Sequence, residues 1–391
     1  MGAAARFAAT PTCAKSASSD GVNLDRYLRQ QAVEGLDVER LGRMRVVVVG
    51  AGAVGNEVVK NLVLMGFGGV DVHDFDRVEM HNLTRSVFLR ESDVGRPKAA
   101  AVAARAAEID PNVRIRAVEG DAWRTLTLAG LAGCDALVAA VDSIEARMKL
   151  SLLAQLARVD FVTAGIDSRY ATVETCPFSR AGAPACYECH LPESAYRKVA
   201  ERYSCGWLRR ALHAEATVPT TAITASVAGA FVVQAVLRLR EAGGASRVLV
   251  DTRGGTASRV ALERNGNCPG CGTLVPRPRC VAARRDWQRA LSTHAPGATF
   301  ILLSDALIFG YACAGCGAAD SSRTYVGRAA ADFDDRIMRC VSCGELAVRI
   351  DVRAEAGVDE LAALCGREPP PAKFLLANLG RDDAVCLDLE D

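Results

Sequence analysis

The sequence predicts an α/β protein built on a doubly wound, mostly parallel sheet, followed by a small β-rich C-terminal domain. Three observations support this fold class. A glycine-rich turn joins a buried strand to a helix near the N-terminus. Further apolar strands then alternate with helices over the first two thirds of the chain. The last third changes character and carries two Cys-x-x-Cys pairs beside a strand-like apolar run.

The first element is a strand at 46–49, directly followed by a Gly-Ala-Gly-Ala-Val-Gly turn. A run of four valines is typical of a buried parallel strand. Gly50 permits a tight turn, Gly52 lets the backbone approach a phosphate, and Gly55 lets the next helix pack on the strand. That helix is predicted at 57–65, with its N-terminus toward the phosphates. The pattern predicts a Rossmann-like unit, and by itself it indicates only that a nucleotide binds.

Polar residues follow a second predicted strand at 69–73. Asp74 ends this strand, where it would accept hydrogen bonds from a ribose. The next stretch contains Asp76, Asn82, Arg85 and Lys98. Hydride transfer has no use for two cations beside the phosphates, whereas chemistry at a phosphate does, because negative charge builds up there. Most Arg and Lys residues are solvated surface charges, so Lys98 is the more informative cation, one of only six lysines beside 41 arginines.

This stretch resembles the nucleotide site of the ubiquitin-activating enzyme superfamily, which includes the ThiF, MoeB and HesA adenylyltransferases. The family signatures D-x-D, N-L-x-R and G-x-P-K are matched by residues 74–76, 82–85 and 95–98. Ala53 and Ser86 depart from the usual glycine and glutamine. The resemblance covers about residues 25–275. It implies that ATP and Mg²⁺ are bound by Gly50, Gly52, Gly55, Asp74, Asp76, Asn82, Arg85, Lys98 and Asp142.

Asp142 and Arg29 carry the remaining family roles. A strand predicted at 136–141 ends just before Asp142, where ligands of open α/β sheets bind. An Asp there could equally cap the following helix at 144–156. The resemblance implies that Asp142 handles Mg²⁺, and both roles stay open. Residues 25–30 alone predict a short solvated helix, whereas the resemblance implies that Arg29 enters the nucleotide site of the partner in a homodimer.

Eight of the fifteen cysteines form four Cys-x-x-Cys pairs. Their spacing, the odd total and the lack of a secretory signal predict metal sites in a reducing compartment, not disulfides. Two distant pairs fit one closed tetrahedral zinc, and the superfamily has such a site: Cys186, Cys189, Cys268 and Cys271. The other two pairs fit a zinc ribbon: Cys313, Cys316, Cys340 and Cys343. We therefore predict two Zn²⁺ ions per chain.

Length and composition set the remaining expectations. The 391 residues carry a formal net charge of +1 and no apolar run near the roughly 20 residues of a membrane helix, so neither nucleic acid nor membrane is expected as a partner. We expect a cytoplasmic protein. The predicted organisation is a disordered tail at 1–24, an adenylation domain at 25–275 with a crossover loop at 190–218, and a zinc-ribbon-like domain at 281–391.

The predicted function is ATP-dependent activation of the C-terminal carboxylate of a ubiquitin-like protein ending in glycine. Thioester transfer to Cys205 and then to a conjugating enzyme would follow, because Cys205 is the only cysteine between the halves of the first zinc site. A buried structural cysteine is the competing interpretation of Cys205. The main alternative is a sulfur-carrier adenylyltransferase for thiamine or molybdenum-cofactor synthesis. An NAD-dependent oxidoreductase and a non-catalytic scaffold are disfavoured by Lys98, Asp142 and the zinc pairs.

Overall fold

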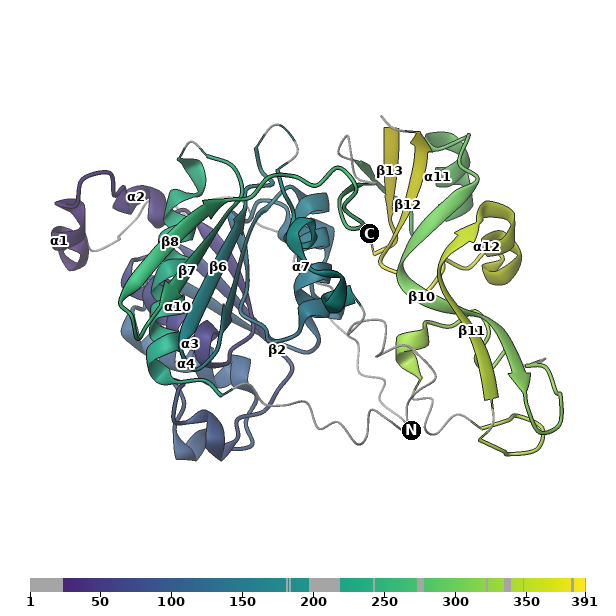
Figure 1. Cartoon of the computed structure of the whole chain (residues 1–391), viewed down its shortest axis with the longest axis horizontal. Coiled ribbons are helices and arrows are strands. Elements are labelled where there is room, and N and C mark those ends of the chain that lie inside the picture. Colours follow the sequence, from purple (N-terminus) through teal and green to yellow (C-terminus); the bar gives the residue numbers. More distant parts are fainter. Residues whose placement is uncertain are drawn as a thin grey trace, which may run out of the picture.

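The computed structural model contains two sheets, each with its own helices (Figure 1). It describes residues 24–390 apart from 181, 183, 197–218, 242, 273–277, 321–322, 334–338, 347 and 381–382. The amino-terminal unit holds an eight-stranded sheet and the carboxyl-terminal unit a five-stranded one. No helix in the described part of the chain has both the length and the apolar character needed to cross a membrane.

The amino-terminal sheet has the strand order β3-β2-β1-β4-β5-β6-β7-β8. Its strands are β1 (Arg45–Val49), β2 (Gly69–Asp74), β3 (Arg114–Glu119), β4 (Ala136–Ala139), β5 (Asp160–Ile166), β6 (Tyr170–Cys176), β7 (Ser246–Asp251) and β8 (Thr256–Ala261). The helices of this unit are α1 (Leu28–Gln31), α2 (Val38–Leu41), α3 (Ala53–Leu64), α4 (Lys98–Ile109), α5 (Ala122–Thr125), α6 (Leu128–Leu131), α7 (Ile144–Ala157) and α10 (Ala222–Leu237).

The pairing of these strands confirms the predicted doubly wound sheet. Strands β3, β2, β1, β4 and β5 pair in parallel, and β6, β7 and β8 continue the sheet antiparallel. The chain moves outward from β1 to β3 and then returns to place β4 on the other side of β1. Ligands of open α/β sheets bind where the order reverses in this way, so the carboxyl ends of β1 and β4 are the expected site.

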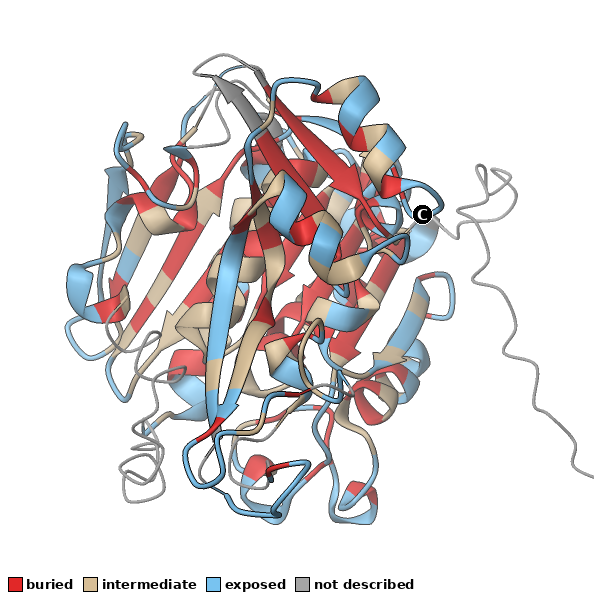
Figure 2. Ribbon diagram, turned by 90° about the vertical axis from the view of Figure 1, so that its right-hand side faces the viewer, coloured by how far each residue is buried: buried red, intermediate tan, exposed pale blue. Residues whose placement is uncertain are grey.

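Two apolar cores cover the two faces of this sheet. Val46 and Val48 of β1 belong to the core shared with α3, α4 and α10, and Val47 and Val49 belong to the core shared with α7. Successive strand side chains point to opposite faces, and both faces are covered here, so every position after Arg45 must be apolar. Figure 2 shows buried residues concentrated on the inner strands, and exposed residues on loops, outer helix faces and some edge strands.

The carboxyl-terminal unit has the strand order β11-β10-β12-β13-β9. Its elements are β9 (Arg279–Ala282), α11 (Trp287–His294), β10 (Phe300–Cys313), β11 (Val348–Gly357), α12 (Val358–Cys365), β12 (Phe374–Gly380) and β13 (Asp383–Asp388). The strand-like apolar run at 300–311 lies within β10, and the alternating run at 346–352 overlaps β11, which begins at Val348. The two helices and the strands β9, β12 and β13 were not predicted, and the cysteine knuckles occupy only the far end of the β10–β11 hairpin.

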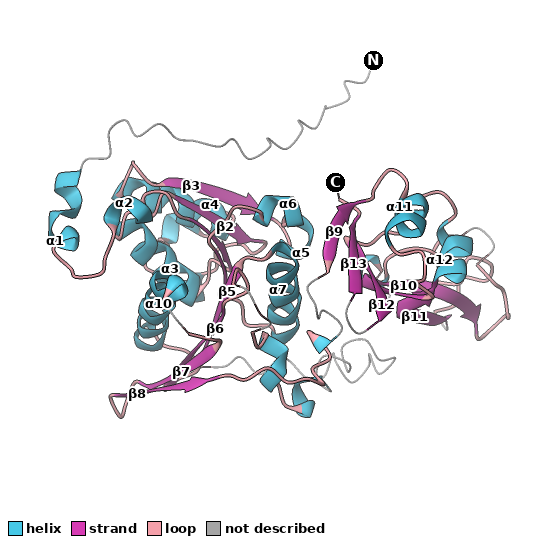
Figure 3. Cartoon of the chain, turned by 90° about the horizontal axis from the view of Figure 1, so that it is seen from above, coloured by secondary structure: helices cyan, strands magenta, loops and turns pink. Residues whose placement is uncertain are grey.

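The two units meet around Trp123 of α5. Its ring packs edge-on against Phe374 of β12, with 6.3 Å between ring centroids, and its Nε1 donates to Asp305 Oδ1 at 2.6 Å. Lys149 Nζ lies 5.3 Å from the centroid of the same ring. Phe374, Leu376 and Cys386 of the second sheet share the apolar core of α7. Figure 3 shows β9 and β13 on the side of the second sheet that faces the amino-terminal unit.

Candidate nucleotide and zinc sites

The glycine turn packs tightly at its ends and is open in its middle. Gly50 has a φ of +97°, and a Cβ there would lie 2.5 Å from the carbonyl oxygen of Ala140. A Cβ on Gly55 would lie 1.8 Å from the carbonyl oxygen of Gly50. A Cβ on Gly52 would meet no atom within 4 Å. Gly50 and Gly55 are therefore required by packing, whereas Gly52 leaves the backbone open to a ligand.

Helix α3 begins at Ala53, four residues before the predicted start at 57. Its first turn is thus part of the glycine turn, and its free backbone N–H groups face the region above Gly52. This arrangement is a ready anion-binding site, because the N–H groups and the helix dipole both favour negative charge.

Asn56 supports the candidate site and was not predicted from the sequence. Its side chain is fully buried, and its Nδ2 donates to the carbonyl oxygens of Ala51 at 2.7 Å and Gly52 at 3.0 Å. Its Oδ1 accepts from the backbone N of Phe88 at 3.0 Å. Asn56 therefore holds the glycine turn to the segment that follows Arg85. The sequence carries no signal for this role, because the contact joins two segments that are distant in the chain.

Asp74 ends β2 beside the glycine turn, as predicted. Its Oδ2 accepts from the backbone N of Ala51 at 2.6 Å, and its Oδ1 accepts from the backbone N of Asp76 at 2.7 Å. Burial raises the pKa of the Asp74 carboxyl, and these backbone hydrogen bonds and the nearby Lys98 oppose that shift. The carboxylate is thus fixed where the carboxyl ends of β1 and β2 meet.

Lys98 is brought to the same edge by α4. It is the first residue of that helix, its backbone N donates to the carbonyl oxygen of Asp76 at 2.9 Å, and its Nζ lies 2.8 Å from Asp76 Oδ2. Arg85 Nη1 donates to the carbonyl oxygen of His81 at 3.1 Å, and no carboxylate among the described residues pairs with it. Asn82 is buried and accepts from the backbone N of Glu79 at 2.9 Å, so here it stabilises the turn that presents Arg85.

Asp142 follows β4 and is exposed. The helix cap that sequence analysis left open for Asp142 belongs to Ser143, whose Oγ accepts from the backbone N of Ala146 at 3.3 Å. Asp142 makes no hydrogen bond or ion pair with any residue in the described ranges. Its carboxylate is thus free at the edge of the sheet where Ala140 closes on Gly50.

Arg29 lies apart from these residues. It is exposed on α1, which Figure 1 places at the outer end of the amino-terminal unit. The segment is held to its own unit by Tyr27, whose hydroxyl donates to Asp110, and by Gln30, whose Nε2 donates to the carbonyl oxygen of Leu64 at 2.8 Å. No described contact brings Arg29 to the nucleotide edge of its own chain.

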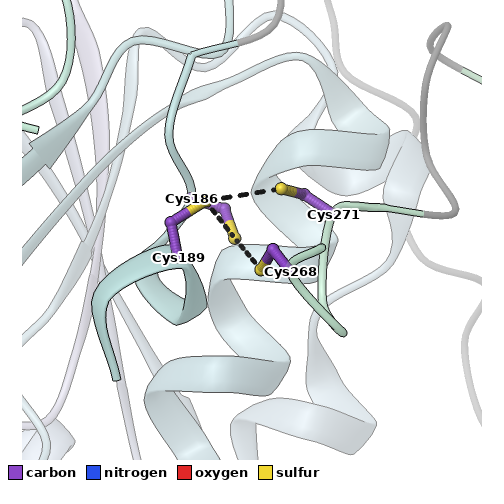
Figure 4. Close-up of side chains that lie close together, drawn as sticks. All are labelled: Cys186, Cys189, Cys268 and Cys271. Carbon is purple, nitrogen blue, oxygen red and sulfur yellow. Dashed lines mark hydrogen bonds between the residues drawn. The ribbon is translucent and has the colours of Figure 1, made fainter. Parts of the chain in front are cut away.

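The first four-cysteine cluster is buried in the amino-terminal unit (Figure 4). Cys186 is the N-cap of the 3-10 helix Tyr187–His190 and Cys189 lies within that helix, whereas Cys268 and Cys271 come from a loop after β8. The Sγ separations are 3.8 Å for Cys186–Cys189, 3.6 Å for Cys186–Cys268 and 3.5 Å for Cys189–Cys271. A tetrahedral zinc with bonds of about 2.3 Å requires sulfur separations of about 3.8 Å, so this inner cluster fits Zn²⁺.

The second cluster joins the far ends of β10 and β11. Cys313 and Cys343 sulfurs lie 3.7 Å apart, and those of Cys316 and Cys340 lie 3.6 Å apart. Backbone N–H groups of Cys316 and Ser342 point at the sulfurs of Cys313 and Cys340, at 3.4 and 3.3 Å. This outer cluster also fits Zn²⁺, and the four-cysteine pairing predicted from the sequence is present in both clusters.

Cys205, the predicted thioester cysteine, lies outside the described residues, as do the arginines near it in sequence and most of the predicted crossover loop. The other predicted residues fall into two groups. The glycine turn, Asp74, Asp76, Lys98, Asn82, Arg85 and Asp142 gather at the carboxyl edge of β1, β2 and β4. Arg29 does not.

This combination of fold and residues defines a class of protein: an α/β protein with a phosphate-type glycine turn at the switch point of its sheet and a buried four-cysteine cluster that could hold a metal ion. Within that class, the chain belongs to the ThiF family, whose match covers residues 24–270. The family membership predicted from the sequence motifs is thereby confirmed.

Several characterised proteins resemble the chain. It is 33% identical over 180 residues to the "SAMP-activating enzyme E1" of Haloferax volcanii, covering 45% of this chain and 65% of that protein. It is 30% identical over 259 residues to the "Sulfur carrier protein adenylyltransferase" of Thermus thermophilus, covering 64% and 91%. It is 29% identical over 227 residues to the "Ubiquitin-like modifier-activating enzyme 5" of Arabidopsis thaliana, covering 53% and 51%.

Solved structures share the fold. The chain aligns with Escherichia coli MccB, solved with ATP, at a TM-score of 0.51 and 21% identity, covering 65% of this chain and 75% of that one.

Proposed function

We propose that this protein uses ATP to adenylate the C-terminal carboxylate of a small ubiquitin-like or sulfur-carrier protein. One observation carries the proposal. A phosphate-type turn, a ribose-type acid, a lysine and an unpaired aspartate gather at one edge of the sheet in a ThiF-family chain. Adenylation requires those groups, because two anions must meet and a more highly charged phosphorus centre must be stabilised.

Each residue has a distinct proposed role. The attacking carboxylate is ionised at neutral pH, so no general base is needed. The open backbone at Gly52 and the N-terminus of α3 bind phosphate oxygens, and Asp74 binds the ribose. Lys98 leaves Asp76 to contact the reacting phosphate, and Arg85 supplies the second cation. Asp142 holds Mg²⁺, which when bound offsets charge on the leaving pyrophosphate.

The pathway is proposed as protein modification. Two of the relatives named above are called activating enzymes and one a sulfur-carrier adenylyltransferase. We propose a thioester at Cys205 and transfer to a conjugating enzyme, because a thiolate attacks an acyl adenylate readily and keeps the acyl group transferable. The sulfur-carrier function is the second candidate, favoured by a relative of which this chain covers 91%.

We also propose a homodimer in which Arg29 acts in the partner's site. Arg29 has no described contact with its own nucleotide edge, and it lies near three exposed apolar side chains on the outer end of the unit: Leu28, Val33 and Leu64. Exposed apolar side chains close together are typical of an interaction surface. Subunit mixing tests this: inactive Arg29→Ala and inactive Asp142→Ala proteins should restore activity together, and no recovery after demonstrated subunit exchange would reject it.

ATP–pyrophosphate exchange tests the adenylation step. Exchange should require the partner protein, and Lys98→Ala and Asp142→Ala should each lower its rate about a hundredfold or more. Lys60→Ala is the matched control, because Lys60 pairs with Glu57 on α3 and has no proposed role in catalysis. Exchange that is unaffected by both site variants would overturn the proposal.

A non-reducing gel then separates the two pathways. Enzyme, ATP and partner should give a thiol-sensitive adduct that Cys205→Ser abolishes while pyrophosphate exchange persists. An adduct that survives Cys205→Ser places the thioester on another cysteine. If no adduct forms although exchange is normal, the sulfur-carrier function becomes the better conclusion.

A further inference from the structure

Five described cysteines lie outside the two metal clusters: Cys134, Cys176, Cys280, Cys365 and Cys386. Among these five, Cys280 alone is exposed. It lies on β9, the edge strand of the second sheet, and its Sγ is 3.8 Å from the carbonyl oxygen of Leu156 at the end of α7. Cys280 therefore lies at the junction of the two units and is open to a reagent in solution.

Cys386 is the direct neighbour of Cys280 in the sheet. Strands β9 and β13 pair in parallel, with Cys280 in register with Cys386. Residues in register on neighbouring strands point to the same face, with the strands about 4.8 Å apart. That spacing falls within the Cα separation of about 4.4–6.8 Å found in disulfides.

The two cysteines differ in the way that an attacking and a resolving thiol differ. Cys386 is fully buried, in the apolar core that β13 shares with α7. The neighbouring Cys386 thiol lowers the pKa of the Cys280 thiol, whereas the neighbouring Cys280 thiol and burial raise the pKa of the Cys386 thiol. The exposed sulfur is the one that more readily becomes a thiolate, which is the nucleophile in thiol–disulfide exchange.

We propose that Cys280 and Cys386 are a redox modification site that forms a reversible intrachain disulfide by exchange with a low-molecular-weight disulfide. The Cys280 thiolate attacks one sulfur of the reagent, forms a mixed disulfide and releases the first reagent thiolate. Cys386 then loses its proton to solvent and attacks the Cys280 sulfur, and the second reagent thiolate leaves. The protein pair loses two electrons and two protons, and the reagent is reduced to two thiols.

The disulfide would join the first and the last strand of the carboxyl-terminal unit. Strand β9 opens this unit and β13 closes it. The disulfide would therefore close a loop of roughly 100 residues and restrict the unfolded chain accordingly. Because Cys280 also contacts Leu156 of α7, the disulfide would lie at the contact with the amino-terminal unit.

The test uses the full chain with its metals bound and oxidised glutathione as the reagent. Non-reducing peptide mapping should find Cys280 joined to Cys386, and the midpoint of thermal unfolding of this unit should rise and return on reduction. Cys386→Ala should instead accumulate glutathione on Cys280, because the resolving thiol is missing. Cys280→Ser should leave Cys386 unmodified, because that thiol is buried.

Cys365 is the matched control thiol. It lies in α12 of the same unit, is partly buried, and burial raises the pKa of its thiol to about 11. Cys280 should react with oxidised glutathione at least tenfold faster than Cys365, and Cys365→Ser should leave the crosslink intact. Glutathione that stays on Cys280 of the wild-type protein without a Cys280–Cys386 bond would overturn the proposal. So would a bond from Cys280 to a cluster cysteine.

Discussion

The inner and outer cysteine clusters present the same four ligands in opposite structural settings. All four inner cysteines are buried, and their ligand pairs come from segments separated by 82 residues. In the outer cluster Cys316 and Cys343 are exposed, and Cys313 and Cys343 are 30 residues apart. Ligand identity and spacing therefore define a metal site, whereas its surroundings decide what the metal stabilises.

The inner cluster is part of the amino-terminal core. The backbone N of Tyr187, between two of its ligands, lies 3.4 Å from Ser151 Oγ of α7, and all four cysteines belong to the core cluster that contains α7. The outer cluster instead closes the end of one hairpin, where β10 and β11 already pair. Loss of the inner metal should thus disturb the fold over a long range, and loss of the outer metal should stay local.

The largest expected difference between the clusters is the loss of stability when one cysteine is replaced. Cys268→Ser should lower the free energy of unfolding of the amino-terminal unit by about 3–5 kcal/mol or more, because a buried metal clip is lost. Cys313→Ser, the matched change in the outer cluster, should leave that unit within about 0.5 kcal/mol of wild type. Hydrogen exchange, monitored as denaturant is added, measures the unfolding of each unit separately. Metal analysis should find two zinc ions per wild-type chain. Equal effects of the two substitutions on β1–β5 would remove the distinction.

The stability of the amino-terminal unit should depend on pH through one buried histidine. His73 of β2 is buried, its Nδ1 lies 3.0 Å from Thr125 Oγ1, and burial lowers its pKa from 6.5 to about 4. The unfolded chain therefore binds a proton between pH 6.5 and 4 that the folded chain does not. Stability is lost as the pH falls through this window, by roughly 3 kcal/mol in total.

His73→Gln should remove this part of the pH dependence, because glutamine does not titrate. Metal release from the cysteines in acid affects wild type and variant alike, so the difference between their two curves isolates His73. The measurement is the free energy of unfolding at pH 7, 6, 5 and 4 for both proteins. Parallel curves would show that His73 does not titrate in this way.

The rate of zinc release should depend on how deeply each cluster is buried. With a chelator in excess, zinc should leave in two phases, with the outer cluster at least about tenfold faster, because two of its sulfurs are exposed. Cys313→Ser should abolish the fast phase and leave the slow one. A single phase in the wild-type protein would show that exposure does not control release here.

The smallest effect concerns the support of the outer cluster. Tyr311 stacks on Tyr325, with 5.5 Å between ring centroids, and its hydroxyl accepts from the backbone N of Val341 at 3.3 Å. Tyr311→Phe keeps the ring and removes the acceptor, at a cost of about 1 kcal/mol. Zinc affinity of the outer cluster should fall several-fold in a competition titration, with the inner cluster unchanged as the internal reference.

Sequence by itself determined the features that depend on local chemistry. Glycine spacing, the valine run, the cysteine pairs and the order Asp74–Asp76–Asn82–Arg85–Lys98 predicted the Rossmann-like sheet, the family and both cysteine clusters. These signals can be recognised in a single sequence because each requires a particular residue type at a short, fixed separation. The five-stranded sheet was predicted only in part, because α11, α12, β12 and β13 have no comparable motif.

Only the tertiary structure decided which side chains meet. It assigned the α7 cap to Ser143 and left Asp142 free, joined the glycine turn to the Arg85 segment through Asn56, and placed Cys280 in register with Cys386. The last two contacts join residues whose separation in sequence carries no period or motif, and they arise when packed elements fix two distant backbones together. Burial has the same origin, which is why identical Cys-x-x-Cys pairs form one enclosed cluster and one that is partly open to solvent.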